Sequence, residues 1–250
     1  FTNSSAEDGF KINIKDLKSK ISSKTKFIII NSPNNPTGRV MSKEELLQIA
    51  DLARENPNIN ILSDEIYELI LKKEFKHYSL SSLANDLKDR IFIINGFAKG
   101  WAMTGWRIGY LVGPKDVIKA SSALQSQSTS NVCSFVQKGA LEALKINNEF
   151  FSMINSHYDQ RRSLLYEGLK NINGIYIEEP NGAFYAFPRL PNASITSIDF
   201  CNKALQDYGL VLVPGKAFGA DECIRMSCAV SEIKIKDGLK RFEKAISKYY

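Results

Sequence analysis

The segment at residues 95–107, NGFAKGWAMTGWR, carries a lysine in unusual surroundings. Lys99 is flanked by apolar, aromatic and glycine residues, and it follows the apolar run at 91–94, which predicts a buried strand. Most lysines of a protein are solvated, but an amine among apolar neighbours is desolvated and available as a nucleophile. Lys99 is therefore the candidate for covalent chemistry, in a loop just past the end of a strand.

Asp64 and the loop at 31–38 follow two other predicted strands. Asp64 comes shortly after the apolar run at 59–62, and a buried carboxylate there needs a cation or hydrogen-bond donors. A helix N-cap is the alternative role, because aspartate favours that position. The loop, NSPNNPTG, has two X-Pro steps and a glycine, which predict an irregular turn. Ligands of open α/β sheets bind beyond the carboxyl ends of strands, so both segments are candidates for a binding site.

Arg225 lies in a fourth segment, within the apolar run IRMSC at 224–228. An arginine inside such a strand suggests a guanidinium that is paired, and its planar fork matches a carboxylate. The partner is either the carboxylate of a ligand or an acidic side chain in an internal salt bridge, and the sequence leaves both open.

Four apolar runs and four longer amphipathic stretches must position these side chains. Strands are expected at 27–30, 59–62, 91–94 and 107–112, and helices at 42–56, 115–127, 132–146 and 148–171. Ser42, with Glu45 three residues later, fits a capping box at the start of the first helix. The last helix is expected to carry Arg161 and Arg162 on its surface. Continuous apolar runs are typical of parallel strands covered on both faces, so the pattern predicts an α/β domain with a mainly parallel sheet.

The pattern of elements changes after Gly174. Shorter strands are expected at 175–177, 183–187, 210–213 and 224–227, with helices at 197–207 and 231–247. This alternation predicts a smaller α+β unit. We therefore divide the chain into a large domain at 1–172 and a small C-terminal domain at 173–250.

Composition excludes several classes of function. The 250 residues carry a formal net charge of +6, but the basic residues are interleaved with acidic ones, so a nucleic-acid partner is not expected. No apolar run approaches the roughly 18 residues that cross a bilayer, and no membrane association is expected. The four cysteines form no CxxC pair and there are two histidines, so no metal site is predicted and a reduced, cytoplasmic setting is favoured. No GxGxxG follows a strand, which disfavours a dinucleotide-binding enzyme.

Taken together, the four segments resemble the fold-type I aminotransferases of the aspartate aminotransferase class. Their order along the chain, SPNNPTG, D-x-x-Y, AK…R and R-x-S, agrees with that family, and the closest likeness is to the bacterial branch with NGFAK-x-x-AMTGWRIGY. The resemblance covers essentially the whole chain. It implies a three-layer α/β sandwich, pyridoxal phosphate as cofactor, and a homodimer. Family members are longer on the N-terminal side, so we expect this chain to lack part of the large domain.

The resemblance assigns the cofactor to five positions. Lys99 would form the Schiff base with pyridoxal phosphate and then act as general base and acid. Asp64 would pair with the pyridinium nitrogen. Asn35 and Tyr67 would hydrogen-bond the phenolic oxygen of the ring, and Arg107, eight residues after Lys99, would bind the phosphate.

The resemblance also assigns the substrate. Arg225 would hold the α-carboxylate of the amino acid, with Asn35 beside it. Ala98 and Gly96 stand where many or some family members have serine, and the bacterial branch shares both features. They weaken a side-chain contact to the phosphate but leave Lys99 and Arg107 in place.

The expected activity is transamination between an amino acid and a 2-oxo acid, as an enzyme of amino acid metabolism. The branch favours aspartate with 2-oxoglutarate, while aromatic substrates and prephenate are alternatives. Other outcomes remain open on sequence: a lyase or synthase of the same fold, or an inactive fragment, dimerisation piece or effector domain. Because residues that complete the site would lie in the missing N-terminal part, we expect the 250-residue chain alone to be poorly active.

Overall fold

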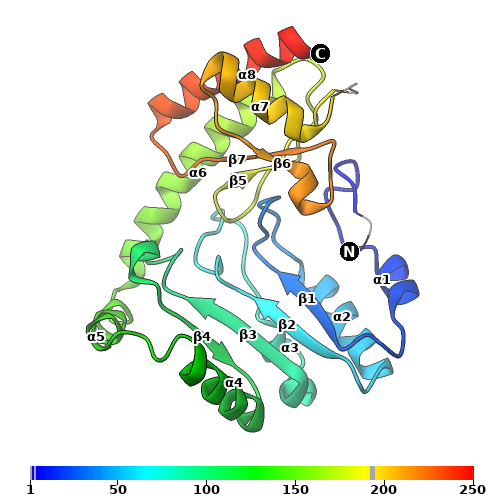
Figure 1. Cartoon of the computed structure of the whole chain (residues 1–250), viewed down its shortest axis with the longest axis vertical. Coiled ribbons are helices and arrows are strands. Elements are labelled where there is room, and N and C mark those ends of the chain that lie inside the picture. Colours follow the sequence, from blue (N-terminus) through cyan, green and yellow to red (C-terminus); the bar gives the residue numbers. More distant parts are fainter. Residues whose placement is uncertain (1, 3, 192–194) are drawn as a thin grey trace.

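A computed structural model describes residues 2, 4–191 and 195–250 of the chain. Figure 1 shows two units, one built around a four-stranded sheet and one around a three-stranded sheet, with the long helix α6 running beside both. In the described residues no helix combines the length and apolar character needed to cross a membrane.

The larger sheet has the strand order β1-β2-β3-β4. Its strands are β1 (Phe27–Asn31), β2 (Asn60–Asp64), β3 (Ile91–Gly96) and β4 (Gly109–Val112). The first three are parallel and β4 is antiparallel to β3, which confirms the mainly parallel sheet. The fourth strand begins at Gly109, not at 107, because Arg107 has a left-handed backbone with φ of 54° that cannot continue a strand.

One face of this sheet is covered by helices of the first hundred residues. They are α1 (Ile14–Lys20), α2 (Lys43–Glu55), α3 (Leu80–Leu83) and the 3₁₀ helix η1 (Asn85–Arg90). Ile30 and Ile61 of the sheet pack with Leu46 and Ile49 of α2 in one buried cluster. Helix α2 begins as predicted, because Ser42 Oγ accepts from the N–H of Glu45 while the Glu45 carboxylate accepts from the N–H of Ser42.

The opposite face of the sheet is open. Alternate side chains of a strand point to opposite faces, so Phe27 and Ile29 point away from α2 while Ile28 and Ile30 point towards it. Ile29 is 69% exposed, and Phe27 and Ile94 are also exposed. The expectation that the strands are covered on both faces is not met at these positions in the described chain, where Phe27 has only the ring of Phe92 beside it, with 5.6 Å between the ring centres. Further along, the chain forms η2 (Thr104–Trp106), α4 (Lys115–Ser128) and α5 (Ser134–Ala143).

The second unit has an antiparallel sheet with the order β5-β7-β6. It consists of α6 (Asn148–Lys170), β5 (Tyr185–Ala186), α7 (Ser197–Tyr208), β6 (Val213–Pro214), η3 (Gly215–Phe218), β7 (Ile224–Ser227) and α8 (Glu232–Tyr249). Leu169, Phe200, Ile224 and Phe242 are central to its core. The strand predicted at 175–177 is reduced to a single bridge of Tyr176, because it has a partner at one residue only. The strand predicted at 210–213 begins only at Val213.

The two units meet where residues 181–183 dock onto the loop that follows β1. The N–H groups of Asn181 and Gly182 donate to the carbonyl of Gly38 at 2.9 and 2.7 Å, and the N–H of Ala183 donates to Ile70 at 2.9 Å. Gly38 has φ of +71°, and a Cβ there would lie 2.8 Å from the carbonyl oxygen of Tyr185, so only glycine suits this position. The domain division at 172/173 stays a prediction, and the last turns of α6 pack in the core of the second unit.

Arg162 of α6 is buried, with 3% of its surface exposed. Its guanidinium pairs with Asp159 and donates to the carbonyl of Ala183 at 2.5 Å. Arg161 is half-buried and faces a different direction, because successive helical residues point about 100° apart. The expectation that both arginines lie on the surface is therefore wrong for Arg162, whose position is set by a segment that follows α6 in the chain.

We expect Arg162→Ala to lower the free energy of unfolding by about 3 kcal/mol, because it breaks a buried ion pair and leaves the Ala183 carbonyl without its donor. The matched change Arg161→Ala should cost no more than about 0.5 kcal/mol. Urea denaturation followed by circular dichroism measures both, and equal losses in the two variants would contradict the assignment of Arg162 to the core.

We expect Ser42→Ala to lower the free energy of unfolding by about 1 kcal/mol, because the first turn of α2 loses its side-chain cap. Ser42→Thr keeps the hydroxyl and should retain most of the stability. Thermal unfolding of the three proteins side by side makes the comparison, and a threonine variant as unstable as the alanine variant would argue against capping.

Candidate active site

Asp64 is the last residue of β2, and the strand register sets it beside Asn31 of β1 and Ile94 of β3. Its Oδ1 accepts from the N–H of Ile66 at 3.2 Å, and no described basic residue pairs with it. Turns follow Asp64 in place of a helix, so the helix N-cap alternative is not realised. Burial raises the pKa of the Asp64 carboxyl above its ordinary value, against the effect of the bond from Ile66. The result is a half-buried carboxylate without a cation.

The neighbouring carboxylate, Glu65, has a different environment. It is buried and accepts hydrogen bonds from Ser63 and Ser79, both at 2.9 Å, and it lies 3.2 Å from His77 Nε2. Its oxygens are therefore already occupied by protein groups, unlike those of Asp64. Glu68 in the same loop accepts from the Asn95 side chain at 2.6 Å, which ties the residues after β2 to the end of β3.

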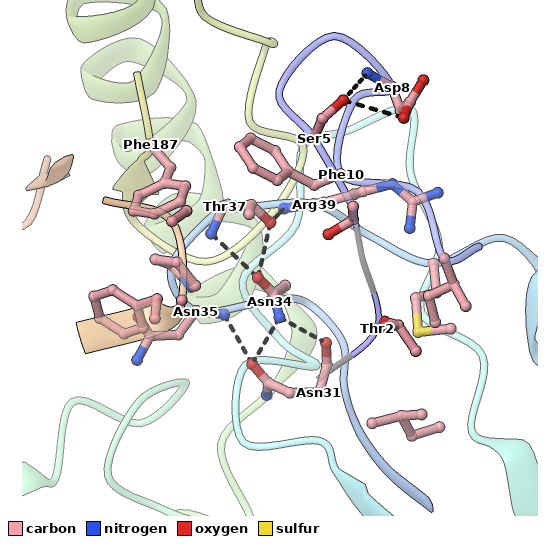
Figure 2. A pocket seen from close by; sticks show the side chains of 18 of the residues that line it. Thr2, Ser5, Asp8, Phe10, Asn31, Asn34, Asn35, Thr37, Arg39 and Phe187 are labelled. Carbon is pink, nitrogen blue, oxygen red and sulfur yellow. Dashed lines mark hydrogen bonds between the residues drawn. The ribbon is translucent and has the colours of Figure 1, made fainter. Parts of the chain in front are cut away.

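Asparagines organise the loop that follows β1, as Figure 2 shows. Asn31 donates from its side chain to the carbonyl of Asp64 at 3.1 Å and accepts from the N–H of Asn35 at 2.8 Å. Asn34 accepts from the N–H and hydroxyl of Thr37 and closes the turn. The loop therefore holds Asn35 in a set position relative to the end of β2.

Lys99 lies in a compact loop between β3 and β4. The carbonyl of Lys99 accepts from the N–H of Ala102 at 3.0 Å, and the Thr104 hydroxyl donates to the carbonyl of Ala98 at 2.7 Å. Lys99 Nζ lies 5.8 Å from the ring centre of Tyr67 and 5.7 Å from that of Phe184. No described acidic residue forms an ion pair with it. The amine therefore faces aromatic rings without a counter-ion.

Arg107 belongs to the same loop but stands apart from the other candidates. It is exposed, and its guanidinium donates to the carbonyl of Thr104 at 3.1 Å. No hydrogen bond or ion pair of the described residues joins it to Lys99, Asp64 or Tyr67. A left-handed backbone in a residue other than glycine is strained by about 1 kcal/mol or more, and such strain is concentrated at functional sites.

Arg225 reaches the site from β7 of the second unit. Its Nη1 donates to Asn35 Oδ1 at 2.8 Å, and its guanidinium lies 4.6 Å from the ring centre of Tyr185 and 5.2 Å from that of Phe218. The internal salt bridge that the sequence left open is not formed with any described carboxylate. The guanidinium is thus oriented by an amide and two rings and is open to an external anion.

Tyr67 stands between Lys99 and the second unit. Its hydroxyl lies 2.9 Å from the hydroxyl of Tyr185, and the two rings pack edge to face. Burial, followed by the hydrogen bond with Tyr185, raises the pKa of Tyr67 above its ordinary value. The hydroxyl therefore stays protonated at neutral pH and can donate a hydrogen bond.

The structure thus brings together five of the six predicted positions, with Arg107 on the margin. Sequence reasoning missed Asn31 and Tyr185, which bridge them. Asn31 was inside the motif at 31–38 but had no role, and Tyr185 was part of the strand expected at 183–187 and had no role either. The contacts of Asn31 with Asp64 and of Tyr185 with Tyr67 join residues more than 30 positions apart, so no local pattern signals them.

A cavity of about 580 Å³ opens beside this cluster, on the side of Asn35. Figure 2 shows its polar wall, with Asn31, Asn34 and Arg39, and the rings of Phe10 and Phe187. Its lining does not include Lys99, Asp64 or Tyr67. The arrangement as a whole offers an amine, a carboxylate and a guanidinium, each without a partner of opposite charge in the described chain.

The sequence profile of the family "Aminotransferase class I and II" matches residues 2–242. The chain belongs to this family. A probable aspartate/prephenate aminotransferase of Rickettsia felis is 40% identical over 255 residues, which cover 98% of this chain and 62% of the relative. An aspartate aminotransferase of Bacillus sp. is 38% identical, with 98% of this chain and 64% of the relative covered.

Solved structures of aminotransferases superpose closely on the chain. The aspartate aminotransferase of Rhizobium meliloti has a TM-score of 0.92 at 33% identity, covering 99% of this chain and 64% of its own. The aspartate aminotransferase of Thermus thermophilus, solved with maleate, has a TM-score of 0.88 at 39% identity, covering 96% and 62%. The chain therefore has the aminotransferase fold and spans a little under two thirds of the length of these relatives.

Aminotransferases of this family depend on pyridoxal phosphate, and the unpaired charges suit that cofactor. A half-buried carboxylate without a cation suits a pyridinium nitrogen, and an amine that faces aromatic rings suits an aldehyde carbon. A protonated tyrosine hydroxyl between them suits a ring oxygen. The residues present thus fit the group.

We expect Asp64→Asn to stabilise the cofactor-free chain at neutral pH and to flatten its stability between pH 3.8 and neutrality. A carboxyl whose pKa is raised on folding binds more protons in the native state, so stability falls as pH rises from the unfolded to the folded pKa. Asparagine keeps the acceptor for Ile66 and removes the charge. The same change should weaken binding of pyridoxal phosphate at least about 30-fold, since one member of a buried charge pair is lost.

Urea denaturation across this pH range, paired with cofactor titration, measures both effects. Asp86→Asn is the matched control, because Asp86 is exposed and bound to Arg54, which lowers its pKa. That variant should gain no stability at neutral pH. A loss of stability in Asp64→Asn, with cofactor affinity unchanged, would refute the charge-pair role.

Proposed function

We propose that the chain forms the cofactor-binding and carboxylate-binding part of an aminotransferase that moves an amino group between an amino acid and a 2-oxo acid. One observation carries the proposal. Lys99, Asp64 and Arg225 surround Tyr67 and Tyr185, and none of the three has a partner of opposite charge in the described chain. These three unpaired groups fit a cofactor with an aldehyde and a basic ring nitrogen, together with a substrate that has a carboxylate.

Pyridoxal phosphate would supply an electron-withdrawing ring that accepts the electron pair left when a bond at the α-carbon breaks. Asp64 would hold a proton on the ring nitrogen, and Arg107 would bind the phosphate. Tyr67 would donate to the ring oxygen. Asn35 would donate to the same oxygen, because its carbonyl is occupied by Arg225 while its NH₂ group has no described acceptor.

Lys99 is the proposed nucleophile and the group that moves the α-proton. Its amine lies beside the rings of Tyr67 and Phe184 and forms no ion pair with a described acidic residue, so no carboxylate competes with an aldehyde for it. Arg225 would bind the substrate α-carboxylate with the guanidinium nitrogens that Asn35 does not use. The bond that breaks would then lie between the amine of Lys99 and the held carboxylate.

For substrates we propose aspartate with 2-oxoglutarate. Relatives named as aspartate aminotransferases support this, and the Thermus thermophilus enzyme was solved with maleate, a dicarboxylate. Prephenate is a second candidate, since the Rickettsia felis relative carries that name as well. We further propose a cytoplasmic homodimer, and the four free cysteines are in keeping with a reducing compartment.

Borohydride reduction in the presence of pyridoxal phosphate, followed by peptide mapping, tests the proposal. We expect the label chiefly on Lys99, because its amine is shielded while most other lysines are solvated. Lys99→Arg should abolish that label. Lys76→Arg is the matched control, since Lys76 also lies over an aromatic ring, 5.3 Å from the centre of Tyr78, but is exposed.

A label spread evenly over many lysines, or one unaffected by Lys99→Arg, would sink the assignment of the nucleophile. The second half of the proposal is checked with aspartate and 2-oxoglutarate, by the formation of oxaloacetate and glutamate. Release of pyruvate, ammonia and a thiol from a cysteine thioether, which carries a leaving group at its β-carbon, would point to a lyase.

A further inference from the structure

Tyr185 contacts both halves of the candidate site at once. It is buried, with 7% of its surface exposed. Its hydroxyl lies 2.9 Å from the Tyr67 hydroxyl, and its ring lies 4.6 Å from the Arg225 guanidinium. Tyr67 belongs to the cofactor side of the site and Arg225 to the substrate side. Among the described residues, no other side chain makes a hydrogen bond or ring contact with both.

The register of the small sheet dictates this contact. Tyr185 of β5 is the partner of Ser227 of β7, and Arg225 lies two residues before Ser227 on the same face. A diagonal neighbour of this kind is within reach of an aromatic side chain. The pairing of β5 with β7 therefore sets the Arg225 guanidinium against the Tyr185 ring, and no loop is needed to bring them together.

The backbone around Tyr185 is also held from both sides. Ala183 has a left-handed backbone with φ of 52°, and its carbonyl accepts from the buried Arg162. Its N–H donates to Ile70, three residues after Tyr67. These two hydrogen bonds hold the backbone before Tyr185 against the turn that carries Tyr67, and so keep the hydroxyls of Tyr67 and Tyr185 close together.

We propose that Tyr185 is a positioning residue that couples the occupancy of Arg225 to the hydrogen bond that Tyr67 donates to the cofactor. The inference rests on the proposed function. It assigns to Tyr185 a role that neither the motifs nor the family match requires.

The coupling follows from the chemistry of two adjacent hydroxyls. Each has one proton, so Tyr67 can donate to the cofactor only while Tyr185 donates to Tyr67. A guanidinium against the face of Tyr185 withdraws electron density and makes its hydroxyl the better donor. A carboxylate on Arg225 neutralises that charge, weakens the donation by Tyr185, and so changes the hydrogen bond that Tyr67 offers.

Besides Arg225, five titratable or charged groups of the described residues lie around the tyrosine pair. They are Asp64, Lys99, Tyr158, Arg162 and Cys228. Burial raises the pKa of Tyr158 and of Cys228, so both stay uncharged at neutral pH. The charge that changes when a carboxylate binds is that of Arg225.

The test compares Tyr185→Phe with the unmodified chain, both loaded with pyridoxal phosphate. Phenylalanine keeps the ring under Arg225 and removes the hydroxyl. The visible absorbance of the Lys99-linked cofactor is titrated against pH, with and without maleate. A weaker bond from Tyr67 favours the protonated chromophore, so its pKa should rise by about half a pH unit to one unit in the variant. The shift that maleate causes should shrink.

Two further variants separate positioning from folding. Tyr158→Phe is the matched control, because the Tyr158 ring stacks on Phe184 beside the site but its hydroxyl does not contact Tyr67. Its titration should match that of the unmodified chain. Tyr185→Leu removes the ring as well, and calorimetry on the cofactor-free chain should show maleate affinity reduced roughly two- to fivefold. Tyr185→Phe should retain that affinity.

Each outcome decides the inference. The coupling is supported if the pKa of the chromophore rises in Tyr185→Phe but not in Tyr158→Phe, while Tyr185→Phe retains the affinity for maleate. If the pKa of the chromophore is unchanged in Tyr185→Phe, the coupling is overturned while the proposed function stands. If the unmodified chain forms no Lys99-linked chromophore, the proposed function fails and this inference fails with it.

Discussion

The site depends on the parallel register of β1, β2 and β3. Parallel strands end at the same edge of a sheet, so the register that pairs Asn31 with Asp64 and Asp64 with Ile94 brings three separate loops together. The loop at 31–38, the turn that carries Tyr67 and the loop that carries Lys99 are all consequences of that pairing. A slip of one residue would turn Asp64 to the opposite face of the sheet.

The second constraint is electrostatic. Within this cluster the chain neutralises some charges and leaves others unpaired. Glu65 is surrounded by two hydroxyls and a histidine, while Asp64, one residue earlier, receives only a backbone N–H. A half-buried carboxylate without a cation costs folding free energy, and a ligand with a basic nitrogen recovers it. The unpaired carboxylate therefore lowers the stability of the ligand-free chain and would raise its affinity for such a ligand.

The third element is the closure of the site by the second unit. Arg225 and Tyr185 come from a different sheet, and they reach Asn35 and Tyr67 only because residues 181–183 dock on Gly38 and Ile70. The buried Arg162 supports the same docking from α6. The residues proposed to bind the substrate carboxylate and the cofactor therefore lie at one interface between the two units.

The sequence by itself determined the local structure and the family, and it nominated the candidate reactive groups. The capping box at Ser42, the helix at 148–170 and the parallel strands follow from period and turn residues, which act over a few residues. The same signals set Asp64 at the end of a strand and Lys99 in the loop after one. The short strands at 175–177 and 210–213 were poorly predicted, because strands of a few residues depend on their partners more than on propensity. Only the tertiary structure decided that Arg162 is buried, that Ile29 is exposed, that Arg225 is held by Asn35, and that Tyr185 joins Tyr67. Most of these contacts join residues more than 20 positions apart, and the covering of a sheet face depends on elements elsewhere in the chain. No local pattern encodes such distances, whereas the packing of the two units sets them directly.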